Sequence, residues 1–168
     1  SAILKGKDVP DPPTDVNMVS CGATQAEIMW NPGNDNNVPI THYIIFYNTT
    51  YDDPGVFTEA TTVRAVYTTG RVRLSPWAEY TFHVKAVSAM GTSKPSAFTS
   101  ATCITPSAIP YKNPTGVCTE DRDPGQLVIT WEPMDQIDHN GEGFRYLVSY
   151  RPRNSPGAQE IQQQVNDW

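Results

Sequence analysis

The segment that decides the fold is Ala26–Pro32, with the sequence AEIMWNP, which returns 101 residues later as Leu127–Pro133, LVITWEP. The spacing from Trp30 to Trp131 is the same as that from Pro13 to Pro114. A period near 100 residues is the length of a small sandwich domain, whereas solenoid repeats are much shorter. The chain therefore contains one module written twice, and a repeated module favours a spacer or binding rod over an active site.

The second copy is shorter than the first. From Trp30 to the end of the first module near Thr105 there are 75 residues, but only 37 follow Trp131. We therefore expect a first module over residues 8–105, a linker over 106–113, and a second module over 114–168 that stops after roughly four strands. Because such a module would leave large apolar side chains uncovered, we expect the natural chain to continue.

Composition excludes several classes of function. Twelve Lys and Arg against 18 Asp and Glu give a net charge of −6, and a nucleic-acid partner needs clustered cations. The apolar stretches are short and alternate with polar residues, so none can span a membrane, and Ser1–Lys7 lacks the apolar run of a signal peptide. The motifs of hydrolases, metalloproteases and phosphate-binding loops are absent. We expect no enzyme activity, no cofactor and no small-molecule substrate.

Alternation of apolar and polar residues predicts an all-β fold. It is clearest in three places: Ala26, Ile28 and Trp30; Tyr43, Ile45 and Tyr47; and the alternate residues from Tyr80 to Ala86. The 15 prolines and 11 glycines supply turns throughout the chain. About seven short strands in the first module would form two antiparallel sheets packed face to face.

The aromatic residues and their spacing resemble those of the fibronectin type III module. The matching pattern is Trp30, Tyr43, Tyr47 and then Leu74-x-Pro76-x-x-x-Tyr80-x-Phe82-x-Val84. The second copy matches at Pro114, Trp131, Pro133, Tyr146 and Tyr150. The resemblance implies tandem antiparallel sandwiches, the second incomplete, in which the Tyr80 hydroxyl bonds back to the chain upstream. The residues expected in the core are Trp30, Tyr43, Leu74, Tyr80, Trp131 and Tyr146.

Loop and surface segments narrow the resemblance. The segments 8–13, 74–82, 113–117, 127–134, 138–140 and 165–168 are similar to the neuroglian family of neural cell adhesion molecules. In that family immunoglobulin domains precede fibronectin type III domains. The resemblance implies an ectodomain segment on the extracellular face of the plasma membrane, which positions immunoglobulin domains and makes lateral contacts. Its partners would be cell-surface proteins, bound homophilically or heterophilically through the full-length receptor, which would reach the membrane through a segment absent here.

A second interpretation remains open, in which the chain is a fibronectin type III spacer of a receptor phosphatase or a secreted enzyme. The sequence immediately upstream distinguishes the two, because immunoglobulin domains would support adhesion and a catalytic domain would contradict it.

Three cysteines leave room for one disulfide bond. In the expected topology the first strand runs away from the entry end, so Cys21 and Cys103 both lie at the exit end, within reach of a bridge. The alternative is two separate thiols, one of them buried. Cys118 is either unpaired or has its partner in the absent strands.

The remaining candidates lie on the surface. Asn48-Thr49-Thr50 is an N-glycosylation sequon at a strand end. His42 and His83 are expected to face solvent on neighbouring strands, and they and the acidic turns fit solvated residues better than a metal site. The residues expected at interfaces are Ile44 and Phe46 on one strand, Trp77 in the turn before Tyr80, and Ile109 and Tyr111 in the linker.

Overall fold

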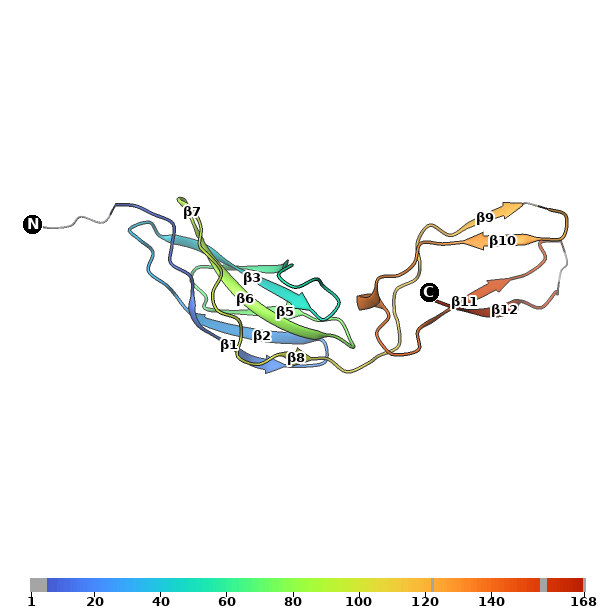
Figure 1. The fold of residues 1–168 in the computed structure, drawn as a ribbon, viewed down its shortest axis with the longest axis horizontal. Helices are drawn as coiled ribbons and strands as arrows, with labels where there is room; N and C mark the ends of the chain where they lie inside the picture. Colours follow the sequence, from blue (N-terminus) through green and yellow to red (C-terminus); the bar gives the residue numbers. More distant parts are fainter. Residues whose placement is uncertain (1–5, 122, 155–156, 168) are drawn as a thin grey trace, which may run out of the picture. The chain divides into compact units, whose positions relative to one another are not determined.

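The computed structural model describes residues 6–121, 123–154 and 157–167, and the chain divides into two compact units (Figure 1). Unit 1 ends at Pro106 and unit 2 begins at Ser107. Within the described residues the regular structure is antiparallel strand, apart from the short 3-10 turn η1 (Gln136–Asp138). The predicted all-β class is confirmed.

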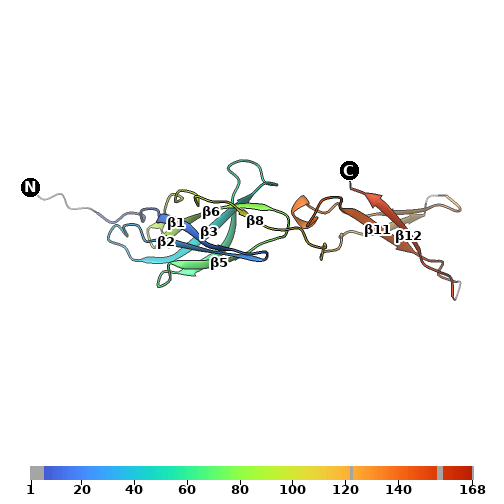
Figure 2. The same ribbon diagram turned by 90° about the horizontal axis from the view of Figure 1, so that it is seen from below.

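Unit 1 is a sandwich of two sheets (Figures 1 and 2). The first sheet has the order β1-β2-β5, with bounds β1 (Thr14–Cys21), β2 (Gln25–Asn31) and β5 (Thr69–Arg73). The second has the order β4-β3-β6-β7, with bounds β4 (Thr58–Arg64), β3 (Ile40–Thr49), β6 (Glu79–Ser88) and β7 (Gly91–Thr92), and β8 (Cys103–Ile104) also pairs with β6.

The core of unit 1 follows the predicted alternation. On β2, Ala26, Ile28 and Trp30 are buried, while the exposed Met29 lies between them. The Trp30 ring packs against Tyr43 with 5.2 Å between ring centroids. The other members of the core are Val16, Ile45, Val72, Leu74, Ala78, Tyr80, Phe82, Val84, Ala86 and Cys103. Burying large side chains such as these contributes about 1.5–3 kcal/mol each.

The last strand of unit 1 is interrupted. It is divided into β7 and β8, and both fragments pair with β6. Between them, Ser93, Ser96 and Thr99 donate their backbone N–H groups to alternate carbonyls of β6, those of Ala86, Val84 and Phe82. The Ser93 and Ser96 hydroxyls also accept hydrogen bonds from N–H groups of β6. Pro95 lies within this segment and has no N–H to donate, so hydroxyl groups complete the pairing that a regular strand would make.

Unit 2 consists of two hairpins in its described part. β9 (Cys118–Asp121) pairs with β10 (Leu127–Thr130), and β11 (Arg145–Tyr150) pairs with β12 (Ile161–Asn166) (Figure 1). Trp131 packs on Tyr146 at 5.2 Å between centroids, yet it is only half-buried. A hollow of about 530 Å³ lies between the hairpins, lined by apolar side chains that include Leu127, Ile129 and Val148. In the described residues, each side of this core is a sheet of only two strands, so the core is left open.

Candidate functional site

The structure directs attention to the ends and the outer face of unit 1. In the part of the chain that the structure describes, no three His, Cys, Asp or Glu residues are grouped so as to hold a metal ion. The described residues also contain no helix long and apolar enough to cross a membrane. The candidate sites considered below are the outer face of unit 1 and the two ends at which the chain enters and leaves it.

The chain enters unit 1 at the end where β2 finishes and β3 begins. The N–H groups of Asp8 and Asp11 donate to the carbonyls of Asn36 and Asn34, and the Asn36 side chain donates to Val9 at 2.7 Å. Gly33 lies directly beneath this segment, since a Cβ atom there would stand 2.5 Å from the Pro12 carbonyl oxygen. The absence of a side chain at residue 33 lets the entering strand lie flat on the turn.

The chain leaves unit 1 at the opposite end, where Thr105 makes a compact network. Its N–H donates to the Ala78 carbonyl at 2.9 Å, and its hydroxyl accepts from the Ala78 N–H at 3.0 Å and donates to Ser75 at 2.7 Å. The Trp77 N–H donates to the Pro106 carbonyl. These bonds hold the exit segment against the turn that precedes β6.

A disulfide bond joins the first and last strands at this exit end. Cys21 ends β1, Cys103 begins β8, and their Cα atoms are 5.7 Å apart across a sequence separation of 82. This is the bond that the topology predicted. Cys118 in unit 2 is exposed and unpaired.

Trp77 adopts a backbone conformation unusual for a bulky residue. Its φ angle is +54°, and its side chain remains 38% exposed. Such a conformation costs about 1–3 kcal/mol and persists only where neighbours enforce it. Tyr51 is one of those neighbours, because its hydroxyl donates to the Trp77 carbonyl and its ring lies 6.2 Å from the indole. Tyr51 was not predicted from the sequence, because its role depends on the loop after β3.

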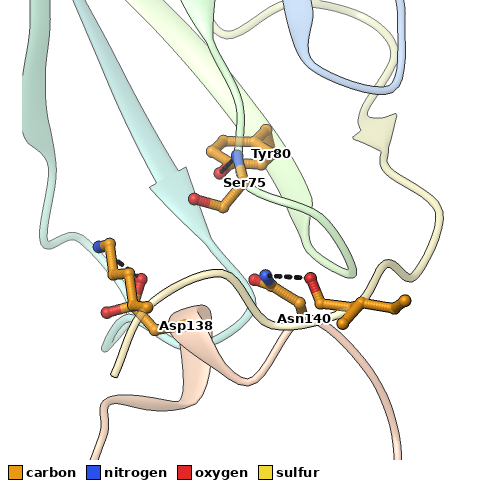
Figure 3. A network of polar contacts seen from close by, with 6 residues as sticks. Ser75, Tyr80, Asp138 and Asn140 are labelled. Atoms are coloured by element: carbon orange, nitrogen blue, oxygen red, sulfur yellow. Dashed lines mark hydrogen bonds and ion pairs between the residues drawn. The ribbon is translucent and has the colours of Figure 1, made fainter. Parts of the chain in front are cut away.

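Two tyrosines bond back to the chain upstream. The Tyr80 hydroxyl accepts from the Ser75 N–H at 2.8 Å (Figure 3), as the resemblance implied. In unit 2 the Tyr146 hydroxyl accepts from the Met134 N–H at 2.9 Å, a bond that the sequence did not predict. Both bonds fix a turn to a strand, and both tyrosines are buried.

The start of unit 2 is also held by hydrogen bonds. The Ala108 N–H donates to the Asn140 carbonyl at 2.8 Å, and Lys112 forms an ion pair with Asp138 at 2.7 Å (Figure 3). The hydrogen bond to Asp138 raises the pKa of Lys112. Between these anchors Ile109 and Tyr111 are 88% and 64% exposed. They are accessible apolar groups beside a fixed backbone, as an interface would require.

The outer face of β3 and β6 departs from expectation. We expected solvated His83 and an exposed apolar strip at Ile44 and Phe46, but His83 is buried at 4% exposure and the two apolar residues are half-buried. Phe57 covers the His83 ring at 4.2 Å between centroids, and Phe98 stacks beside it at 5.9 Å. The prediction was wrong because alternation identifies the outward face but not the loops that fold over it.

Burial makes His83 a weak base. Loss of solvent, with Lys85 nearby, lowers its pKa from 6.5 to about 4. The Lys85 ammonium lies 4.8 Å from the centroid of Phe46, a cation–π contact. At neutral pH the His83 ring is therefore uncharged.

The two-sheet sandwich of unit 1 is the fold of a known domain family. The fibronectin type III domain family matches residues 11–102, and the chain belongs to that family.

Its relatives are neural adhesion molecules. The chain is 38% identical over 162 residues to neuroglian of Drosophila melanogaster and 37% identical over 147 residues to the neuronal cell adhesion molecule of Rattus norvegicus. These matches cover 96% and 88% of the chain but 12% of each relative. Among solved structures, the chicken CNTN1 FN1–FN3 domains match 91% of this chain and 52% of that one, with 27% identity and a TM-score of 0.61.

Proposed function

We propose that this chain is an extracellular spacer and interaction segment of a cell adhesion receptor, where it positions immunoglobulin domains and adds lateral contacts. The similarity to neuroglian and to neuronal cell adhesion molecule supports the receptor class. The receptor would act through partners on the same or an opposing cell, and no step of its function would require a cofactor.

The observation that carries the spacer proposal is the path of the chain through unit 1. Entry bonds tie Asp8 and Asp11 to the turn before β3, and exit bonds tie Thr105 to the turn before β6. In Figure 1 the segments before β1 and after β8 leave unit 1 at opposite ends. Ten-residue strands such as β3 and β6 give a module length of about 30 Å. A module built in this way adds length along the chain and does not fold it back.

The best candidates for lateral contacts lie at the exit end of unit 1 and in the segment that follows it. Trp77, Ile109 and Tyr111 are exposed, and hydrogen bonds hold the backbone at Trp77 and at Ala108, which precedes Ile109. Large aromatic side chains such as those of Trp77 and Tyr111 are common at interfaces. We propose that these residues, rather than the covered Phe46, make contacts in the assembled receptor.

The spacer proposal is tested in the full-length receptor on apposed cells. One variant carries a second copy of residues 8–105, and a matched control carries the same insertion with Trp30→Ala in the added copy, which removes its core tryptophan. We expect electron tomography to show the membrane gap widened by about 30 Å for each receptor with the folded insertion. The control should give a broader, irregular gap. An unchanged gap with the folded insertion would contradict the proposal.

A further inference from the structure

The outer face of unit 1 contains an aromatic hollow, which we define by Phe46, Phe57, His83 and Phe98. Its volume is about 430 Å³, and Lys85 and Pro95 lie on its rim. Phe98 is 57% exposed and the adjacent Val56 is 52% exposed, so the hollow opens to solvent. Apolar rings around an open hollow favour a ligand with an apolar face.

His83 adds a polar group without a partner to this wall. Its side chain is 96% buried, and neither ring nitrogen has a hydrogen-bond partner. A buried polar group left unsatisfied costs about 1–3 kcal/mol, so it is usually paired in the functional state. The neutral ring offers one donor and one acceptor. Because Phe57 covers the ring and both nitrogens are shielded from solvent, an occupant of the hollow would contact the aromatic rings.

The sequon at Asn48 lies beside the hollow. Asn48 and Phe46 are two residues apart on β3, so both side chains lie on the outer face, where they pair with Thr81 and His83 of β6. The Asn48 Nδ2 atom donates to the carbonyls of Val56, at 2.7 Å, and Asp53, at 3.2 Å. Val56 directly precedes Phe57, whose ring covers His83. A group attached at Asn48 would therefore start beside Val56, the residue next to Phe57 of the aromatic hollow.

We propose that Asn48 carries an N-linked glycan and that its first N-acetylglucosamine packs across Phe46 and Phe57. This inference rests on the extracellular location in the proposed function. In the modification, Nδ2 loses a proton and forms a bond to C1 of the sugar. The bond from C1 to the diphosphate of a lipid-linked oligosaccharide breaks, and the diphosphate leaves with the electron pair.

The two hydrogen bonds of Asn48 fit this attachment. Nδ2 carries two hydrogens, and the sugar replaces one of them, so one N–H remains. The remaining N–H keeps the 2.7 Å bond to the Val56 carbonyl, and the longer bond to Asp53 is lost. That bond fixes the amide plane beside Phe57. Because the sugar is then tethered next to the rings, its effective concentration over the hollow is high.

The test uses the whole chain made in a secretory eukaryotic cell, with glycan occupancy measured by mass before and after N-glycanase. The glycosylated protein is compared with Thr50→Ala, which removes the sequon but leaves the Asn48 side chain in place. We expect the glycan to raise the thermal midpoint of unit 1, followed through the NMR amide signals of β3 and β6, by about 4 °C.

The packing itself is tested by making the same comparison in a Phe46→Ala background. There the glycan should raise the midpoint by less than about 1 °C. Ile44→Ala is the matched control, because Ile44 shares the outer face but lies one pair further from Asn48, and it should keep the full effect. After trimming to a single sugar, the acetyl methyl signal should be shifted upfield by the aromatic rings in the wild type and not in Phe46→Ala.

Two results would overturn the proposal: an unmodified Asn48, or a glycan whose effect and methyl shift are the same with and without Phe46. Neither result would affect the spacer proposal, which depends on the membrane gap.

Discussion

The two units contain the same aromatic pair in nearly the same geometry, but its burial differs. Trp30 and Tyr43 lie 5.2 Å apart with 59° between their ring planes, and Trp131 and Tyr146 lie 5.2 Å apart with 58° between theirs. Trp30 is only 1% exposed, whereas Trp131 is half-buried. The repeated sequence thus reproduces the local contact, and the difference comes from what covers it.

In unit 1 the aromatic pair is buried by residues of strands that have no counterpart among the described residues of unit 2. Leu74, Tyr80, Phe82 and Val84 come from β6 and the segment that leads into it, and all are buried against the pair and its neighbours. The corresponding space in unit 2 is the hollow between its hairpins. The aromatic pair joins the two sheets, and the further strands that complete those sheets in unit 1 supply much of the remaining free energy of burial.

The largest difference between the units should follow from removing each tryptophan. Trp30→Ala should lower the free energy of unfolding of unit 1 by about 3–5 kcal/mol, because it leaves a cavity in a closed core. Trp131→Ala should cost unit 2 only about 1–2 kcal/mol, since part of that side chain already contacts water. Urea titration monitored by amide signals of each unit measures both. Equal losses of stability for the two variants would show that the closed core of unit 1 and the open core of unit 2 do not differ in what the tryptophan contributes.

The disulfide bond should account for the next largest effect, and only in unit 1. The pair Cys21→Ser and Cys103→Ser should destabilise unit 1 by about 2–4 kcal/mol, because the unfolded chain is no longer closed into a loop. Cys118→Ser is the matched control and should change neither unit. Urea denaturation of the wild type, the double variant and Cys118→Ser measures this. A double variant as stable as the wild type would show that the disulfide does not stabilise unit 1.

Acid should destabilise unit 1 through His83. Its pKa is 6.5 when unfolded and about 4 when folded, so the unfolded state binds more protons between these values. The stability from the neutral ring is complete above pH 6.5 and declines as pH falls toward 4, by about 2–3 kcal/mol. His83→Phe should flatten this dependence, while His42→Gln should not. Denaturation midpoints between pH 7 and 4 give the slopes.

The smallest effect concerns the two tyrosine hydroxyls. Tyr80→Phe should cost about 1–2 kcal/mol, because the Ser75 N–H loses an acceptor beside a closed core. Tyr146→Phe removes the matching bond to the Met134 N–H and the bond from the hydroxyl to Asp167, but the core of unit 2 is open, so about half the cost is expected. A larger loss for Tyr146→Phe would reverse the order of the two units.

The sequence predicted what depends on alternation and spacing. The strands, the buried faces with Trp30 and Tyr43, and the Cys21–Cys103 bridge follow from short-range pattern and topology, and the resemblance to the fibronectin type III module implied the Tyr80 bond. It failed where a loop decides the environment of a strand residue. His83 sits on an outward position, yet Phe57 from the loop before β4 and Phe98 from the segment after β7 bury it. No periodicity reports where a loop folds.

Hydrogen exchange measures whether the same aromatic pair is stable only where further strands complete the two sheets around it. The corresponding strands are β3, which holds Tyr43, and β11, which holds Tyr146. We predict that the most protected amides of β3 exchange at least about 100-fold more slowly than those of β11 in the same sample, a difference of about 3 kcal/mol. Equal protection of β3 and β11 would contradict this, because it would show that the aromatic pair alone stabilises each unit.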